Sequence, residues 1–138
     1  MHTANSDLVR SIYADWECGE FGRVEWAHPD IEYTDVDGLS PGSVTGLKAM
    51  AARWRDFMTD WDDFRAEAEE YRELDDERVL VFHRFSGRGK TSGVEVGPTG
   101  SKGACLFHVL NGKVAKLLLY SLRERARTDL GLSPERES

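Results

Sequence analysis

The sequence predicts an α+β fold in which helices cover one face of a curved antiparallel sheet. Two amphipathic helical patterns occupy the first half of the chain, and strand patterns follow one another through the second half. Between the last two apolar strand patterns lies Asn111-Gly112, a pair typical of a tight hairpin turn. Helices followed by a series of strands are typical of an α+β domain.

The first element is a helix that ends at Gly19, because glycine is favoured just after helix C-termini. Asn5 or Ser6 can cap its start by accepting a hydrogen bond from an early backbone N–H. A shorter amphipathic helical run follows, then a His28-Pro29-Asp30 turn and a strand over Ile31-Glu32-Tyr33. The apolar residues of the first helix share one face: Leu8, Val9, Ile12, Tyr13 and Trp16.

A loop with two glycines and a proline, residues 37–45, precedes a second long helix. The length of this loop in a compact domain indicates the mouth or lid of a pocket. The second helix is predicted from about residue 46 to residue 61, with charged residues on one side and an apolar stripe on the other. The stripe consists of Leu47, Met50, Ala51, Trp54, Phe57, Met58 and Trp61.

The rest of the chain predicts an antiparallel meander. Residues 64–69 alternate between apolar and charged side chains, as in a strand with one solvated face, and Asp75-Asp76 supplies a turn. Residues 79–85 are apolar at almost every position, so this strand is expected to be covered on both faces. The remaining elements are an interrupted strand over the glycine-rich segment 87–103, a hairpin of residues 104–110 and 114–122, and a short helix over 124–130.

Composition limits the class of protein. The 138 residues suit one domain over 1–138, with a core of about 8–132 and a frayed tail over 133–138. A net charge of −7 without a basic stripe disfavours nucleic-acid binding. No apolar run approaches the ~20 residues of a membrane span, and two isolated cysteines without a signal peptide indicate a cytoplasmic protein. No metal-ligand spacing and no cofactor motif occurs in the sequence.

Apolar residues also predict an oligomer. The strand over 79–85 and the run over 117–120 are apolar on both faces, while the helices can cover only one face of the sheet. A homodimer packed through the other face is the expected cover.

Several short motifs follow one another along the chain: His28-Pro29-Asp30, the Gly46 helix start, Gly87-Arg88-Gly89 with Ser92-Gly93-Val94-Glu95-Val96, and Asn111-Gly112-Lys113-Val114. Their order resembles SnoaL-like proteins, within the nuclear transport factor 2-like superfamily that includes ketosteroid isomerases. The resemblance covers residues 8–132 and implies a cone-shaped sheet wrapped by three to four helices around a central pocket. The superfamily hosts isomerases, cyclases, epoxide hydrolases and inactive proteins, so the resemblance implies a pocket for a small hydrophobic molecule rather than one reaction.

Asp35 is the candidate catalytic residue. It lies at the end of the first strand, on the alternation face of Tyr33, and it matches the general base of ketosteroid isomerases. A carboxylate there can move a proton next to a carbonyl, although Asp35 can equally pin the loop through backbone N–H groups. The oxyanion donors of those isomerases are missing, because Ile12 and either Ala104 or Cys105 stand at their places, and Tyr13 is expected to be turned ~100° away.

Two hypotheses therefore stay open. The chain is either an acid–base enzyme of the isomerase or cyclase type with Asp35 as base, or a non-catalytic ligand-binding or accessory protein; a purely structural dimerisation module is a third reading. The excess of aromatic residues favours a flat hydrophobic ligand. The residues expected to contact it are Trp16, Tyr33, Trp54, Phe57, Met58, Trp61, His83 and Phe107.

Overall fold

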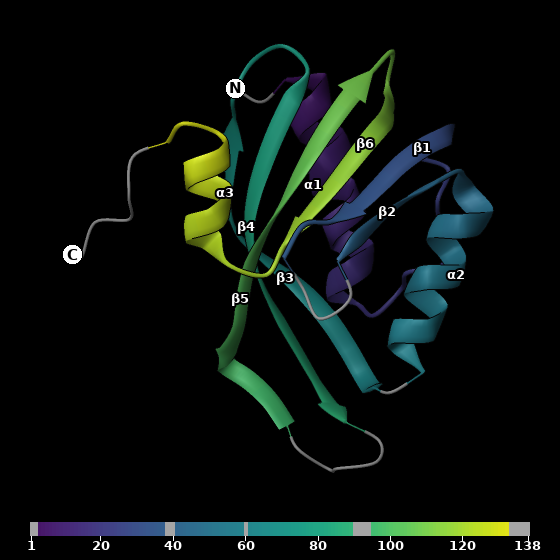
Figure 1. The fold of residues 1–138 in the computed structure, drawn as a ribbon, viewed down its shortest axis with the longest axis vertical. Coiled ribbons are helices and arrows are strands. Elements are labelled where there is room, and N and C mark those ends of the chain that lie inside the picture. The colour runs from purple at the N-terminus through teal and green to yellow at the C-terminus, as the bar shows by residue number, and fades with distance from the viewer. Residues whose placement is uncertain (1–2, 38–40, 60, 90–94, 133–138) are drawn as a thin grey trace.

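The computed structural model describes residues 3–37, 41–59, 61–89 and 95–132, with the side chains of residues 89–101 outside that description. Within these residues the chain has the expected α+β fold, and the predicted tail over 133–138 lies outside them. In chain order (Figure 1), the elements are α1 (Ala4–Glu17), β1 (Ala27–Asp35), β2 (Gly42–Thr45), α2 (Leu47–Met58), β3 (Trp61–Glu73), β4 (Arg78–Gly89), β5 (Glu95–Leu110), β6 (Lys113–Tyr120) and α3 (Arg123–Asp129).

The six strands form one open, curved sheet in the order β2-β1-β6-β5-β4-β3 (Figure 1). Neighbouring strands are antiparallel except β1 and β6, which pair in parallel, so the sheet is mixed. The expected meander covers β3 to β6. The parallel pair arises because the chain leaves β1 through β2 and α2 and returns beside β1 only with its last strand. This curved sheet with its helices is the cone of the predicted fold class.

The first helix has specific ends. Thr3, and not the predicted Asn5 or Ser6, caps α1, because the Thr3 side-chain oxygen accepts a hydrogen bond from the backbone N–H of Ser6 at 3.1 Å. Gly19 follows the helix as predicted, with a φ of +83° that glycine adopts without strain. The predicted second helical run is wrong: residues 18–26 form turns and irregular backbone. Glycines within this short segment lower its helix propensity.

The predicted turn and loop partly form strands. His28-Pro29-Asp30 lies within β1, where His28 Nδ1 accepts a hydrogen bond from the Asp30 N–H at 2.9 Å. Residues 42–45 form the edge strand β2, and residues 38–40 of the same loop lie outside the described part. The predicted extension of α2 to Trp61 is also wrong. The helix ends at Met58 with Thr59 as its C-cap, whose N–H and hydroxyl both donate to the Arg55 carbonyl, at 3.0 and 2.7 Å, and Trp61 begins β3.

The two predicted turns are confirmed. The Asp75 carboxylate accepts hydrogen bonds from the backbone N–H groups of Glu77 and Arg78, at 2.9 and 2.8 Å, and so closes the β3–β4 connection. Asn111 and Gly112 both have positive φ, +52° and +75°, as the tight turn between β5 and β6 requires.

Both faces of the sheet are covered within the chain. A large buried cluster lies between α1 and the strands, and a second cluster packs Leu80 and Phe82 of β4 against Ala126 of α3. The Arg123 side chain fixes α3 by donating to the carbonyls of His83, at 2.8 Å, and Gly103, at 3.1 Å. The face that the sequence assigned to a homodimer is therefore covered in part by α3, on the side opposite α2 in Figure 1.

Candidate functional site

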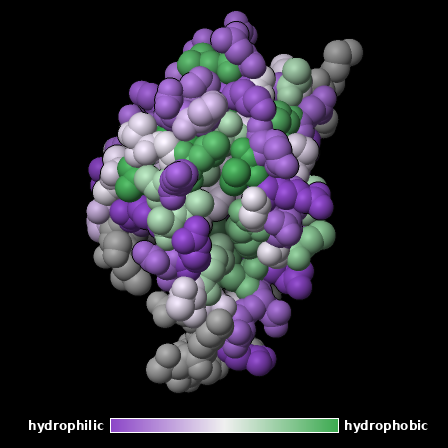
Figure 2. Space-filling model, turned by 90° about the vertical axis from the view of Figure 1, so that its right-hand side faces the viewer, coloured by the Kyte–Doolittle hydropathy of each residue, from purple (hydrophilic) through white to green (hydrophobic). Residues whose placement is uncertain are grey.

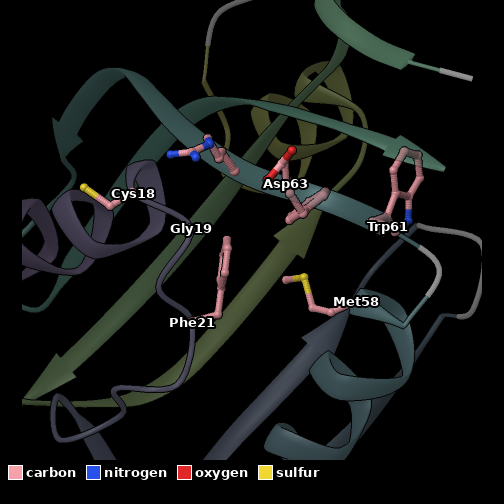
Figure 3. Close-up of a pocket in the computed structure, with 8 residues that line it drawn as sticks. Cys18, Gly19, Phe21, Met58, Trp61 and Asp63 are labelled. Atoms are coloured by element: carbon pink, nitrogen blue, oxygen red, sulfur yellow. The ribbon is translucent and has the colours of Figure 1, made fainter. Parts of the chain in front are cut away.

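An open pocket of about 380 Å³ lies where the C-terminal ends of α1 and α2 meet the start of β3. In Figure 3, Met58 extends from the end of α2 toward Phe21, which follows α1. The pocket is lined by Cys18, Gly19, Phe21, Met58, Trp61, Asp63, Phe64 and Arg65.

A β-bulge in β3 shapes one wall of the pocket. Asp62 pairs with Arg88 but Arg65 pairs with Ser86, so β3 has one residue more than β4 over this stretch. Asp63 has a φ of +53° there, a left-handed conformation that residues other than glycine seldom adopt. Bulges occur next to functional sites, where they redirect side chains.

Two glycines let the bulge approach its neighbours. A Cβ atom on Gly87 of β4 would lie 3.3 Å from Phe64 Cα and 3.3 Å from Trp61 Cε3. A Cβ atom on Gly19 would lie 3.6 Å from the Phe64 carbonyl oxygen. The bulge is thus packed between the glycine of β4 and the end of α1.

Aromatic rings connect the pocket with the core. The Phe64 ring centroid lies 5.7 Å from that of Phe21 and 6.0 Å from that of Trp61. Phe21 in turn stacks on Trp16, with a centroid distance of 5.8 Å and an interplanar angle of 21°. Figure 2 views the molecule from the side of α2 and shows apolar residues gathered in the middle of that face, with hydrophilic residues around them.

The residues expected to contact a ligand do not lie together. Met58 and Trp61 line the pocket. Phe57 is 45% exposed and packs against Trp61 and Phe64, and Trp54 is half-buried. The other four lie buried in the interior: Trp16, Tyr33, His83 and Phe107.

Sequence reasoning missed most of the pocket lining. The sequence predicts Phe21 in a helical run that does not form, and it predicts Phe64 in a strand but not in the site. The signal that could have found them is the pair of glycines, Gly19 and Gly87, at the points where the backbone comes close to β3.

Asp35 lies on the inner face of β1, as expected, but it does not line the pocket. Its carboxylate Oδ2 is 3.8 Å from Nη2 of Arg53 on α2, and its side chain is 14% exposed. Burial, together with the nearby Cys105 and Asp35, raises the pKa of the neighbouring Tyr33 phenol. A buried neutral phenol beside an ion-paired carboxylate can orient a polar group of a ligand, and it can also hold β1 against α2.

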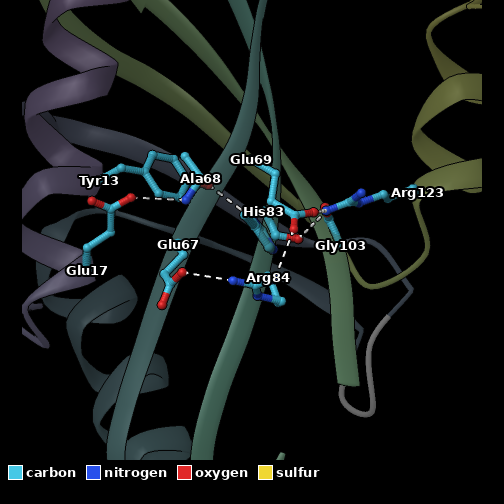
Figure 4. Close-up of polar contacts among 9 residues, drawn as sticks. All are labelled: Tyr13, Glu17, Glu67, Ala68, Glu69, His83, Arg84, Gly103 and Arg123. Carbon is cyan, nitrogen blue, oxygen red and sulfur yellow. Dashed lines mark hydrogen bonds and ion pairs between the residues drawn. The ribbon is translucent and has the colours of Figure 1, made fainter. Parts of the chain in front are cut away.

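Two buried polar side chains, Tyr13 of α1 and His83 of β4, form a hydrogen bond with each other in the core. The Tyr13 phenol oxygen is 2.9 Å from Nδ1 of His83, and both side chains are fully buried (Figure 4). Tyr13 lies on the predicted apolar face of α1, which buries both Ile12 and Tyr13. Burial raises the pKa of Tyr13, while burial and then the charge of Arg123 lower the pKa of His83 to about 3. The pair is therefore neutral at pH 7.

Among the described residues, no group of three or more His, Cys, Asp or Glu side chains could hold a metal ion. Nor does the described part of the chain include a helix that is long and apolar enough to cross a membrane. The two cysteines are free thiols, with Cys18 exposed and Cys105 buried.

Comparison with known proteins identifies the family. The sequence model of the SnoaL-like domain matches residues 9–117. A comparison with curated proteins gave no match. Among solved structures, an NTF2-like protein of unknown function from Burkholderia pseudomallei is 20% identical, with a TM-score of 0.76, over 92% of this chain and 97% of the other.

Two further structures share the fold at lower identity. A candidate SnoaL-like polyketide cyclase from Jannaschia sp. is 16% identical, with a TM-score of 0.67, over 95% of this chain and 94% of the other. A protein with a ketosteroid isomerase-like fold from Catenulispora acidiphila, in complex with trimethylamine, is 13% identical, with a TM-score of 0.69, over 92% and 94%. At these identities the likeness concerns the fold.

Proposed function

Because the chain belongs to the family of SnoaL-like domains, we propose that it binds a small hydrophobic molecule in the pocket between α1, α2 and β3. The observation that carries this proposal is the wall of Phe21, Met58, Trp61 and Phe64 around about 380 Å³. Volumes of ~300–1,000 Å³ with apolar and aromatic walls are typical of small-molecule sites. Proteins of the same fold include a candidate polyketide cyclase and a complex with trimethylamine, which supports a role in small-molecule binding.

The exposed thiol of Cys18 provides the test. Cys18 is exposed and lines the pocket, so a bound molecule should slow its alkylation by a thiol reagent. Compounds from a library of small hydrophobic molecules are first selected because they raise the melting temperature. Each is then expected to slow the reaction of Cys18. If every stabilising compound leaves the alkylation rate unchanged, the molecules bind elsewhere and the proposal is wrong.

Two variants sharpen this experiment. Trp61→Ala removes a ring from the pocket wall and should reduce both the stabilisation by the ligand and the protection of Cys18. Leu110→Ala removes an exposed apolar side chain at the end of β5, outside the lining, and should leave both unchanged.

Acid–base chemistry is the second candidate function, and Asp35 favours it. Its side chain is largely buried, shares the inner face of β1 with Tyr33 and is paired with Arg53. In any assay that detects turnover, Asp35→Asn should abolish activity in protein that circular dichroism shows to be folded. An Asp35→Asn variant with full activity would eliminate this residue as the base and leave the binding function.

We also propose that the protein is a cytoplasmic homodimer. The two free thiols fit a reducing compartment. The exposed apolar side chain of Leu122 is available to a second copy, although α3 already covers part of the outer face.

A further inference from the structure

We propose that the ligand of this pocket is an organic cation, with an alkylated ammonium group on an apolar body. This inference rests on the proposed function and names the chemical class that the same site takes. It follows from the rings and the carboxylate that border the pocket.

The rings of the pocket wall are suited to a positive charge. Phe21, Trp61 and Phe64 line the same pocket, and Phe64 contacts both of the other rings. The faces of aromatic rings carry partial negative charge and attract ammonium groups within about 6 Å of the ring centroid. The polarisable sulfur of Met58 borders the same space.

Two helix C-termini meet at the pocket. Cys18 is the C-cap of α1 and Met58 is the last residue of α2, and both line the pocket. The C-terminal end of a helix carries about half a negative charge on its unpaired carbonyl groups. The last turn of α1 contains no basic residue, but Arg65 of β3 donates to the Glu17 carbonyl there, and the last turn of α2 contains Arg55. The helix ends are therefore largely offset, and the rings and Asp63 determine the sign of the charge that the pocket favours.

The charged side chains support the same sign. Asp63 lines the pocket from the bulge, in its left-handed conformation. Among the described residues that line the pocket, Arg65 is the only basic one, and its Nη1 donates to the Glu17 carbonyl at the end of α1, at 3.1 Å. Arg65 is thus engaged with that carbonyl, while the carboxylate of Asp63 would complement the charge of the ligand.

The test compares two molecules of equal shape and different charge. Choline carries a trimethylammonium group, and 3,3-dimethylbutan-1-ol has the same shape with a neutral carbon in place of the nitrogen. Each is titrated into the full chain while tryptophan fluorescence and the alkylation rate of Cys18 are followed. Choline is expected to bind at least ~10-fold more tightly than the alcohol, which corresponds to ~1.4 kcal/mol.

Variants assign the preference to the proposed groups. Asp63→Asn keeps a residue that tolerates the left-handed conformation and should reduce the preference for choline without weakening the alcohol. Trp61→Leu should reduce it as well, while Trp61→Phe, which keeps a ring, should restore part of it. Asp7→Asn is the matched control, because it removes the same charge at the opposite end of α1 and should change nothing.

The outcomes separate this inference from the proposed function. If choline and the alcohol bind with equal affinity and both protect Cys18, the site is hydrophobic and the proposal of a cationic ligand is wrong. Tighter binding of choline that survives Asp63→Asn and Trp61→Leu would place the cation elsewhere and also overturn it. If neither choline nor the alcohol protects Cys18 but an uncharged aromatic compound does, the proposal of a cationic ligand is wrong and the proposed function stands. If choline, the alcohol and the aromatic compound all fail to protect Cys18, both proposals are wrong.

Discussion

Gly87 of β4 lies directly against Phe64 of β3: a Cβ atom on Gly87 would be 3.3 Å from both the Cα and the Cδ1 atoms of Phe64. The glycine-rich segment of β4 thereby determines how closely the bulge packs, and with it the position of one wall of the pocket. The Gly87-Arg88-Gly89 motif has a structural reason in this contact.

Gly87→Ala is expected to displace Phe64 and Trp61 and to lower the free energy of unfolding by ~1–3 kcal/mol, as overpacking does. Denaturant unfolding measures this change. The control is Gly22→Ala, whose added Cβ atom would meet only the end of the Glu20 side chain. An alanine at position 87 without effect on stability or on Cys18 alkylation would show that the contact does not shape the pocket.

The native protein is expected to present one reactive thiol and one unreactive thiol. Cys18 is exposed, whereas burial raises the pKa of the Cys105 thiol to about 12 and keeps it protonated. Because the thiolate is the nucleophile, alkylation should be fast at Cys18 and very slow at Cys105. Mass spectrometry after brief alkylation should find one modified cysteine in the native protein and two after unfolding in denaturant. Rapid modification of Cys105 in the native protein would contradict its burial.

His83 is expected to make folding sensitive to acid. Its pKa is lowered from 6.5 in the unfolded chain to about 3 in the fold, chiefly by burial. Between these values the unfolded chain binds a proton that the folded chain does not, so stability falls as the pH falls, by up to ~1.4 kcal/mol per pH unit. His83→Asn should flatten the profile of stability between pH 6.5 and pH 3. The control is His108→Asn, a partly exposed histidine paired with Glu77. If both variants have the same profile, His83 does not carry this dependence.

The proposed homodimer predicts sedimentation as a dimer at micromolar concentration. Leu122 is 62% exposed at the start of α3, so Leu122→Glu should favour the monomer without lowering the unfolding free energy of the monomer. Leu118 packs against the second buried cluster, so Leu118→Glu should reduce both assembly and stability. A wild-type monomer would contradict the dimer.

Elements with a clear period could be predicted from the sequence. The alternation after residue 64, the apolar strand over 79–85 and the Asn111-Gly112 turn each depend on neighbours along the chain. Trp61 could not be assigned in this way, because its position fits both the period of α2 and the start of β3. The structure places Trp61 at the start of β3, where it pairs with Gly89 of β4.

The site was harder to predict because it depends on contacts between distant residues. Phe21, Trp61 and Phe64 come together through a bulge and two close approaches of glycine, and none of these has a period in the sequence. The pairing of Tyr13 with His83 joins residues 70 positions apart. The helical pattern that buries Tyr13 is visible in the sequence, but its partner on β4 is not.

Because β1 pairs in parallel with β6, β1 is the first strand to be synthesised but cannot complete its pairing until the last strand is present. Thr34 has Leu118 as its partner in the sheet, so the first strand to leave the ribosome can join only when the last one is available. Until then β1 has only the short β2 beside it, while β3, β4 and β5 can already pair with one another. Contacts of such long sequence separation slow folding, so β4 and β5 should gain protection from hydrogen exchange before β1. A nascent chain that stalls before Lys113 would leave the edge of β1 that faces β6 without its hydrogen-bonding partner.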